Sequence, residues 1–181
     1  SKNYECNFYV QKNKKTNVIY GSHPSGDVFI NERTVNLILP LLQSQNYLKK
    51  AEVYNDETID VNLNLFREVP ISFYFHSARW YMHLTGTQFD MTSPCLDVEP
   101  HKIIKDKIVI MRSPRYRNIY IDYKLLKNVN NIVCIGLESE YQNLKKDIPN
   151  LEFYNCKNFL EMAQIIKSSK FFIGNLCFAY S

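Results

Sequence analysis

Long hydrophobic runs are missing from this chain of 181 residues. Its apolar stretches are broken by polar residues or proline well short of the roughly 20 residues that a membrane-spanning helix needs. Closely spaced cysteine pairs are missing too. The five cysteines lie scattered without a C-x-x-C motif, which argues against a disulfide framework or a zinc site. We therefore expect a soluble, cytoplasmic protein.

A strong charge of one sign is also lacking. Lys and Arg number 22 against 18 Asp and Glu, which leaves a net charge of +4. This excess is too small to indicate nucleic acid or an anionic membrane as a partner, so any basic site has to be local. The chain contains no HExxH, Walker or G-x-G-x-x-G motif, and it therefore does not fit a metalloprotease, a P-loop ATPase or an ordinary dehydrogenase.

What the sequence does contain is a regular succession of strands and helices in its second half. Continuous apolar runs predict strands at 107–111, 131–135, 151–154 and 171–173. Helical segments are expected between them at 122–127, 140–147 and 158–167, the second headed by Ser139 and Gln142 as a capping box. Short apolar strands joined by helices indicate a parallel sheet covered on both faces, with ligands at the edge where the strands end.

The first half carries weaker patterns. Residues 32–45 have the apolar spacing of a helix that Asn31 caps and Pro40 kinks, and alternation over 59–65 predicts a half-exposed strand. Further elements are expected as strands at 7–10, 17–20, 51–54 and 71–75 and as a helix at 78–84. The proline-containing segment 92–100 is the expected linker between domains at 1–98 and 99–181.

Three arginines, Arg112, Arg115 and Arg117, follow the strand at 107–111 within six residues. A guanidinium can hold two phosphate oxygens at once, so this loop suits a diphosphate group. The alternative is a solvated basic loop. Gly136 ends the next strand just before a helix, whose free N–H groups suit an anion or a ribose, although a glycine there also fits an ordinary turn.

The remaining candidates are less specific. His23 and Asp27 lie in a turn-rich loop and are weak candidates for an acid–base pair, the alternative being an exposed histidine. Cys177 follows the last strand, but no histidine is placed to activate it, so a packed thiol is expected.

Several segments carry a family resemblance. Residues 107–118 (KIVIMRSPRYRN), 136–141 (GLESEY) and 159–179 (FLEMAQIIKSSKFFIGNLCFA) resemble the glycosyltransferase-B-fold proteins related to the heptosyltransferases. Residues 39–47 (LPLLQSQNY) and 62–67 (NLNLFR) look like the first domain of an uncharacterised branch of that group. The resemblance implies an α/β protein of two Rossmann-like domains, with a nucleotide-sugar donor held mainly by the second, parallel-sheet domain.

The resemblance also assigns donor-binding residues. It implies that the arginines face the diphosphate, that Gly136 and Glu138 face the nucleoside, and that Asn175 faces the phosphates near the last loop. Heptosyltransferases have Asp-Thr/Ser-Gly and a nearby His in that loop, where this chain has Asn175-Leu176-Cys177. The Gly-rich first loop of the family is not found before Ser1. We therefore expect both domains to be incomplete in this sequence and the chain to be inactive alone.

The favoured hypothesis is a fragment of a glycosyltransferase that moves a sugar from a nucleoside diphosphate to a glycan or small-molecule acceptor hydroxyl. No metal, cofactor, nucleic acid or membrane span is expected, and a homodimer is an open expectation. Two alternatives also stay open. The first is a non-catalytic nucleotide-binding module. The second is a protein that binds single-stranded nucleic acid by stacking bases on Tyr116, Tyr120 and Tyr123.

Overall fold

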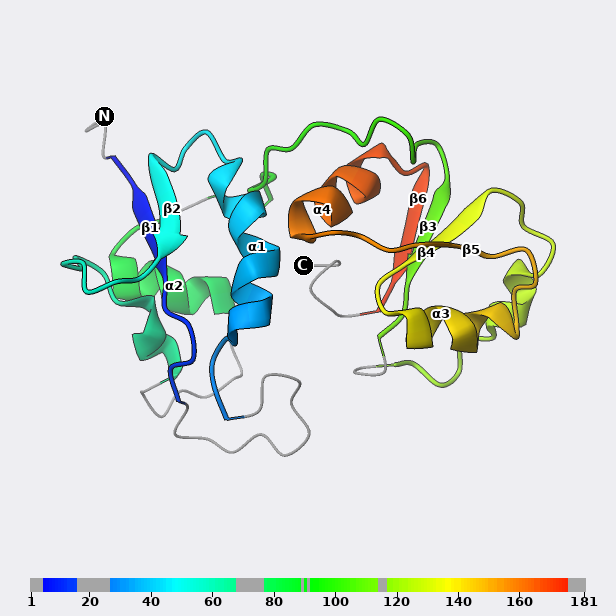
Figure 1. Ribbon diagram of the computed structural model, residues 1–181, viewed down its shortest axis with the longest axis horizontal. Helices are drawn as coiled ribbons and strands as arrows, with labels where there is room; N and C mark the ends of the chain where they lie inside the picture. Colours follow the sequence, from blue (N-terminus) through cyan, green and yellow to red (C-terminus); the bar gives the residue numbers. More distant parts are fainter. Residues whose placement is uncertain are drawn as a thin grey trace. The chain divides into compact units, whose positions relative to one another are not determined.

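The computed structural model describes residues 5–15, 27–67, 77–88, 90, 92–113 and 117–175. The chain divides into two compact units, Ser1–Asp97 and Val98–Ser181 (Figure 1). Residues 94–100, which contain this division, have neither helix nor strand. No helix among the described residues is long and apolar enough to cross a membrane.

The unit at residues 98–181 is built on a parallel sheet. Its strands are β3 (Ile108–Met111), β4 (Ile132–Ile135), β5 (Glu152–Tyr154) and β6 (Phe171–Gly174). They lie in the order β5-β4-β3-β6, and all three pairings are parallel. The four predicted strands are confirmed. This unit is a mixed α/β structure compatible with a Rossmann-like fold.

The central strands β3 and β4 are buried on both faces of the sheet, as their unbroken apolar runs predict. Successive strand residues point to opposite faces, so Val109 and Ile110 enter two different cores and both are fully buried. One core includes Leu144 of α3 (Glu138–Lys145) and Tyr123 of the 3₁₀ helix η2 (Tyr123–Leu126). The other includes Met162 and Ile165 of α4 (Phe159–Ser168), the helix beside the strands in Figure 1.

Two helix predictions in this unit need correction. Helix α3 begins at Glu138, two residues earlier than expected, and Ser139 and Gln142 do not form its capping box. Glu140 supplies the capping contact instead, because its carboxylate accepts a hydrogen bond from the Leu137 N–H at 3.0 Å. The segment expected to be helical at 122–127 forms only the short η2, which Asp122 caps at the Lys124 N–H.

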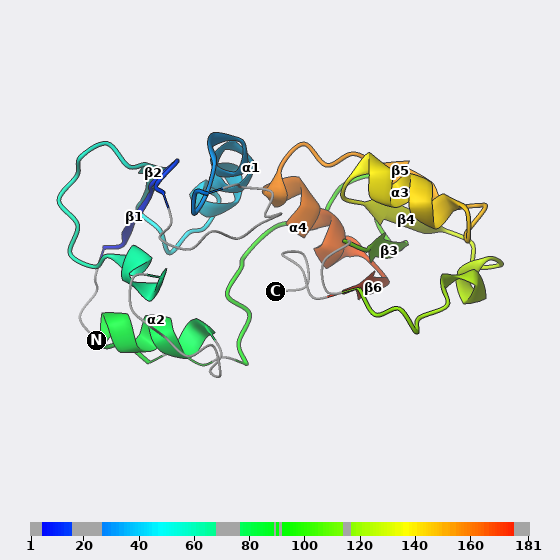
Figure 2. The same ribbon diagram turned by 90° about the horizontal axis from the view of Figure 1, so that it is seen from below.

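The unit at residues 1–97 contains a smaller parallel pair, β1 (Asn7–Val10) and β2 (Lys50–Val53). Helix α1 (Glu32–Gln43) begins as predicted, with the Asn31 side chain accepting from the Thr34 N–H at 2.9 Å. It continues through Pro40 and ends two residues earlier than expected. Helix α2 (Ser77–Thr85) confirms the helix predicted near Trp80, and Figure 2 shows these elements from below.

The predicted strand at 59–65 is wrong. Residues 57–62 are irregular, and the 3₁₀ helix η1 (Leu63–Arg67) follows them. The Asn62 side chain accepts a hydrogen bond from the Asn64 N–H at 3.0 Å, which closes a turn where the pattern predicts a strand. Asn and Asp side chains compete in this way with strand pairing, and the alternation cannot reveal that competition. The strands expected at 17–20 and 71–75 lie outside the described residues.

Candidate functional site

The C-terminal ends of three adjacent strands bring three of the predicted residues to one edge of the sheet. Arg112 directly follows β3, Gly136 follows β4 and Asn175 follows β6. The strands are parallel, so these residues lie at the edge where open α/β folds bind ligands.

Arg112 is a buried arginine, with 4% of its surface exposed. One guanidinium nitrogen, Nη2, donates a hydrogen bond to the Asn143 side-chain oxygen of α3. The guanidinium carbon lies 4.9 Å from the centre of the Tyr123 ring, a cation–π contact. The other terminal nitrogen, Nη1, is buried and has no hydrogen-bond partner among the described residues. A buried cation with an unpaired donor is costly, and an anion would satisfy it.

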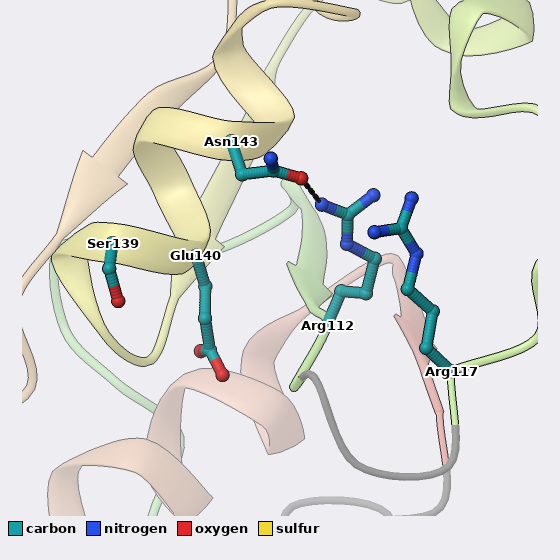
Figure 3. Close-up of a pocket in the computed structure, with 5 residues that line it drawn as sticks. All are labelled: Arg112, Arg117, Ser139, Glu140 and Asn143. Carbon is teal, nitrogen blue, oxygen red and sulfur yellow. Dashed lines mark hydrogen bonds between the residues drawn. The ribbon is translucent and has the colours of Figure 1, made fainter.

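Arg117 brings a second positive charge to the same place. Figure 3 shows its guanidinium beside that of Arg112, with Arg112 between it and Asn143 of α3. Burial lowers the pKa of Arg112, and the neighbouring Arg117 charge lowers it further, because both disfavour positive charge there. The two arginines line a hollow of about 270 Å³ whose other lining residues are Ser139, Glu140 and Asn143.

Glu140 is the acidic group of this hollow, and the sequence reasoning missed it. Its residue surface is 6% exposed, and burial raises the pKa of its carboxyl, against the opposing effects of the Leu137 hydrogen bond and Arg112. Gly136 leaves room for this carboxylate, since a Cβ there would lie 2.7 Å from Glu140 Oε2. Gly136 also has a φ of +120°, which favours glycine. The structure thus gives Gly136 a packing role beside Glu140.

Two other predicted donor-binding residues lie outside the hollow's lining. Glu138 is exposed on the first turn of α3. The Asn175 side chain donates to the Ser113 carbonyl and accepts from the Ser113 N–H, both at 3.0 Å. These side-chain bonds lie just beyond the last β3–β6 pair, Met111 with Gly174. This contact joins the end of β6 to Ser113, the residue after Arg112.

The other candidate residues do not contribute to the hollow as described. Three of them lie outside the described residues: His23, Arg115 and Cys177. The fourth, Asp27, is exposed. Of the tyrosines proposed to stack bases, Tyr116 is also outside the described residues. Tyr123 is 6% exposed and lies under Arg112, so it offers no open face to a base, whereas Tyr120 is 90% exposed.

The spacing of α3 could have revealed Glu140 and Asn143. They lie three residues apart on a helix that follows a glycine-ended strand, and side chains with this spacing share a helix face. The described residues hold no group of three or more His, Cys, Asp or Glu side chains suited to a metal ion.

No protein-family model, curated protein or solved structure matches the chain. The resemblance to the heptosyltransferase-related proteins therefore stays a prediction, and the function is argued from the hollow itself.

Proposed function

We propose that the unit at residues 98–181 binds the diphosphate of a nucleotide-sugar donor in the hollow lined by Arg112 and Arg117. The observation that carries this proposal is the buried Arg112 Nη1, which has no hydrogen-bond partner among the described residues and lies beside a second guanidinium. Arginine is suited to diphosphate because its charge is permanent and its donors lie in one plane.

The corresponding activity is transfer of the sugar from the nucleoside diphosphate to an acceptor hydroxyl. As the bond to the sugar breaks, negative charge grows on the departing diphosphate. Two guanidiniums beside the diphosphate stabilise that charge, which is the kind of electrostatic contribution that accelerates group transfer. The acceptor and the base that activates it belong to the prediction from family resemblance.

A non-catalytic nucleotide-binding module is the second candidate. One observation favours it: Asn175, the predicted phosphate contact of the last loop, has its side-chain amide engaged with Ser113. This alternative predicts the same binding without turnover of a nucleotide sugar.

The test is calorimetric titration with a panel of nucleoside diphosphates and their sugars, followed by assay of any binder for sugar transfer. Arg117→Ala should weaken binding roughly tenfold or more, since a charge-assisted hydrogen bond contributes about 1.5 to 3 kcal/mol. Lys124→Ala is the matched control, because Lys124 is an exposed cation of the same unit that does not line the hollow. Equal losses in both variants would contradict a specific site at the hollow.

A further inference from the structure

One acidic residue lines the hollow together with its two cations. Glu140 lies on α3 and the arginines follow β3, and in Figure 3 the Glu140 carboxylate points away from the two guanidiniums. The Leu137 N–H donates to Glu140 Oε2 at 3.0 Å, and Gly136 leaves space for the carboxylate because it has no Cβ. A bound anion would therefore have a carboxylate at the wall of its site.

We propose that Glu140 couples anion binding in this hollow to the uptake of a proton, so that ligand affinity depends on pH. The inference rests on the proposed function, since it takes the hollow to be the site of a phosphate-bearing ligand. It goes further in assigning Glu140 the role of setting the charge that the site presents to that ligand.

The charges around Glu140 make it the titrating group of the hollow. Of the five lining residues, Ser139 and Asn143 do not titrate in water, and arginines keep their protons at any ordinary pH. Cys134 of β4 also interacts with Glu140, but burial raises the pKa of this thiol to about 12, so it stays protonated. Asp147, near the end of α3, is the other acid that interacts with Arg112.

The direction of the coupling follows from charge repulsion. A bound dianion disfavours a second negative charge beside it and so raises the pKa of Glu140 above that of the empty site. Burial already places the empty-site value above the ordinary 4.5. By linkage, the anion binds more tightly to the protein in which Glu140 is protonated. Its affinity therefore rises once the pH falls below the pKa that Glu140 has in the bound state. Each pKa unit of change on binding makes a tenfold difference in affinity.

Sulfate is the probe for this test, because it remains a dianion across the acidic and neutral range and does not itself titrate. Its dissociation constant is measured on the full chain by NMR titration at about pH 5 and about pH 8, with the Leu137 amide as a local reporter. The substitution is Glu140→Gln, which keeps an oxygen acceptor for the Leu137 N–H and removes the charge. Glu138→Gln and Asp147→Asn are the controls, since both remove a carboxylate of the same helix region outside the lining.

The wild type and both controls should bind sulfate more tightly at the lower pH, by about tenfold for each pKa unit of coupling. Glu140→Gln should lose this dependence and bind at the higher pH about as tightly as the wild type does at the lower. A pH dependence that persists in Glu140→Gln, or that disappears in Asp147→Asn instead, would overturn the role of Glu140. It would leave the proposed function untouched. Failure of every form to bind sulfate at either pH would overturn the proposed function with it.

A measurement on the wild type keeps the test independent of how the variant folds. Calorimetric titration in two buffers of different ionisation enthalpy reports the protons taken up on binding. The inference expects net uptake that is largest near the pKa of Glu140. Binding without any proton uptake between about pH 5 and about pH 8 would contradict it.

Discussion

At the scale of single residues, the site contains two buried groups of opposite charge, each with an energetic cost. Arg112 is stacked on Tyr123 and bonded to Asn143, yet its Nη1 is buried without a partner among the described residues. Glu140 is satisfied by the Leu137 N–H, yet burial disfavours its charge. Features of this kind are expected at sites that bind ligands, because the ligand supplies what the protein lacks.

Gly136 provides the first stability prediction. Gly136→Ala places a Cβ 2.7 Å from Glu140 Oε2 on a backbone with φ of +120°, so we expect a loss of about 1 to 3 kcal/mol in the free energy of unfolding. Gly86→Ala is the control, since its φ is +66° but nothing lies within 4 Å of the added Cβ. Urea denaturation measures both. A smaller loss for Gly136→Ala than for the control would contradict the role assigned to Gly136.

The raised pKa of Glu140 provides the second stability prediction. The pKa of the Glu140 carboxyl is near 4.5 in the unfolded chain and higher in the folded protein. Its contribution to the free energy of unfolding is therefore fully present below pH 4.5 and is lost as the pH rises through the folded-state pKa. Glu140→Gln should therefore be at least as stable as the wild type at neutral pH, with this advantage disappearing at acidic pH. Denaturation at several pH values tests this. A variant less stable than the wild type by more than about 1 kcal/mol at neutral pH would show that the ionised group stabilises the fold.

At the scale of elements, the sequence predicted the strands of the 98–181 unit well and the loops poorly. Strands β3 and β4 are apolar at every position because both faces are covered, so their pattern has no competing interpretation. The segment at 59–65 alternates clearly, but the Asn62 side chain closes a turn there instead. Local side-chain hydrogen bonds of this kind leave no trace in apolar periodicity.

The Asn175 contact gives a prediction about how elements are joined. Asn175→Ala removes two hydrogen bonds to the Ser113 backbone, which should cost about 1 to 3 kcal/mol and weaken the connection between the end of β6 and the residue after Arg112. We expect lower stability and weaker nucleoside diphosphate binding together. Asn155→Ala, at an exposed position after β5, is the control. Unchanged stability with a large loss of binding would instead support the direct phosphate contact implied by the family resemblance.

At the scale of the whole molecule, every residue that lines the hollow belongs to the 98–181 unit. The sequence predicted the sheet edge and two of the five lining residues, Arg112 and Arg117. Glu140 and Asn143 were missed, although their spacing on α3 places them on one helix face, and the buried Tyr123 could not be predicted, because its contact depends on which side of η2 faces the core. Glycosyltransferase activity and the identity of the donor remain predictions.

The central claim is that Arg112 and Arg117 bind the phosphates of a nucleotide ligand. The most direct measurement follows the Arg112 Nε–Hε resonance by NMR while a nucleoside diphosphate is added to the full chain. The account predicts a saturable shift of this resonance, together with the Leu137 amide, and a much weaker response in Arg117→Ala. A nucleotide that binds while the Arg112 resonance stays unmoved would place the ligand elsewhere and contradict the account.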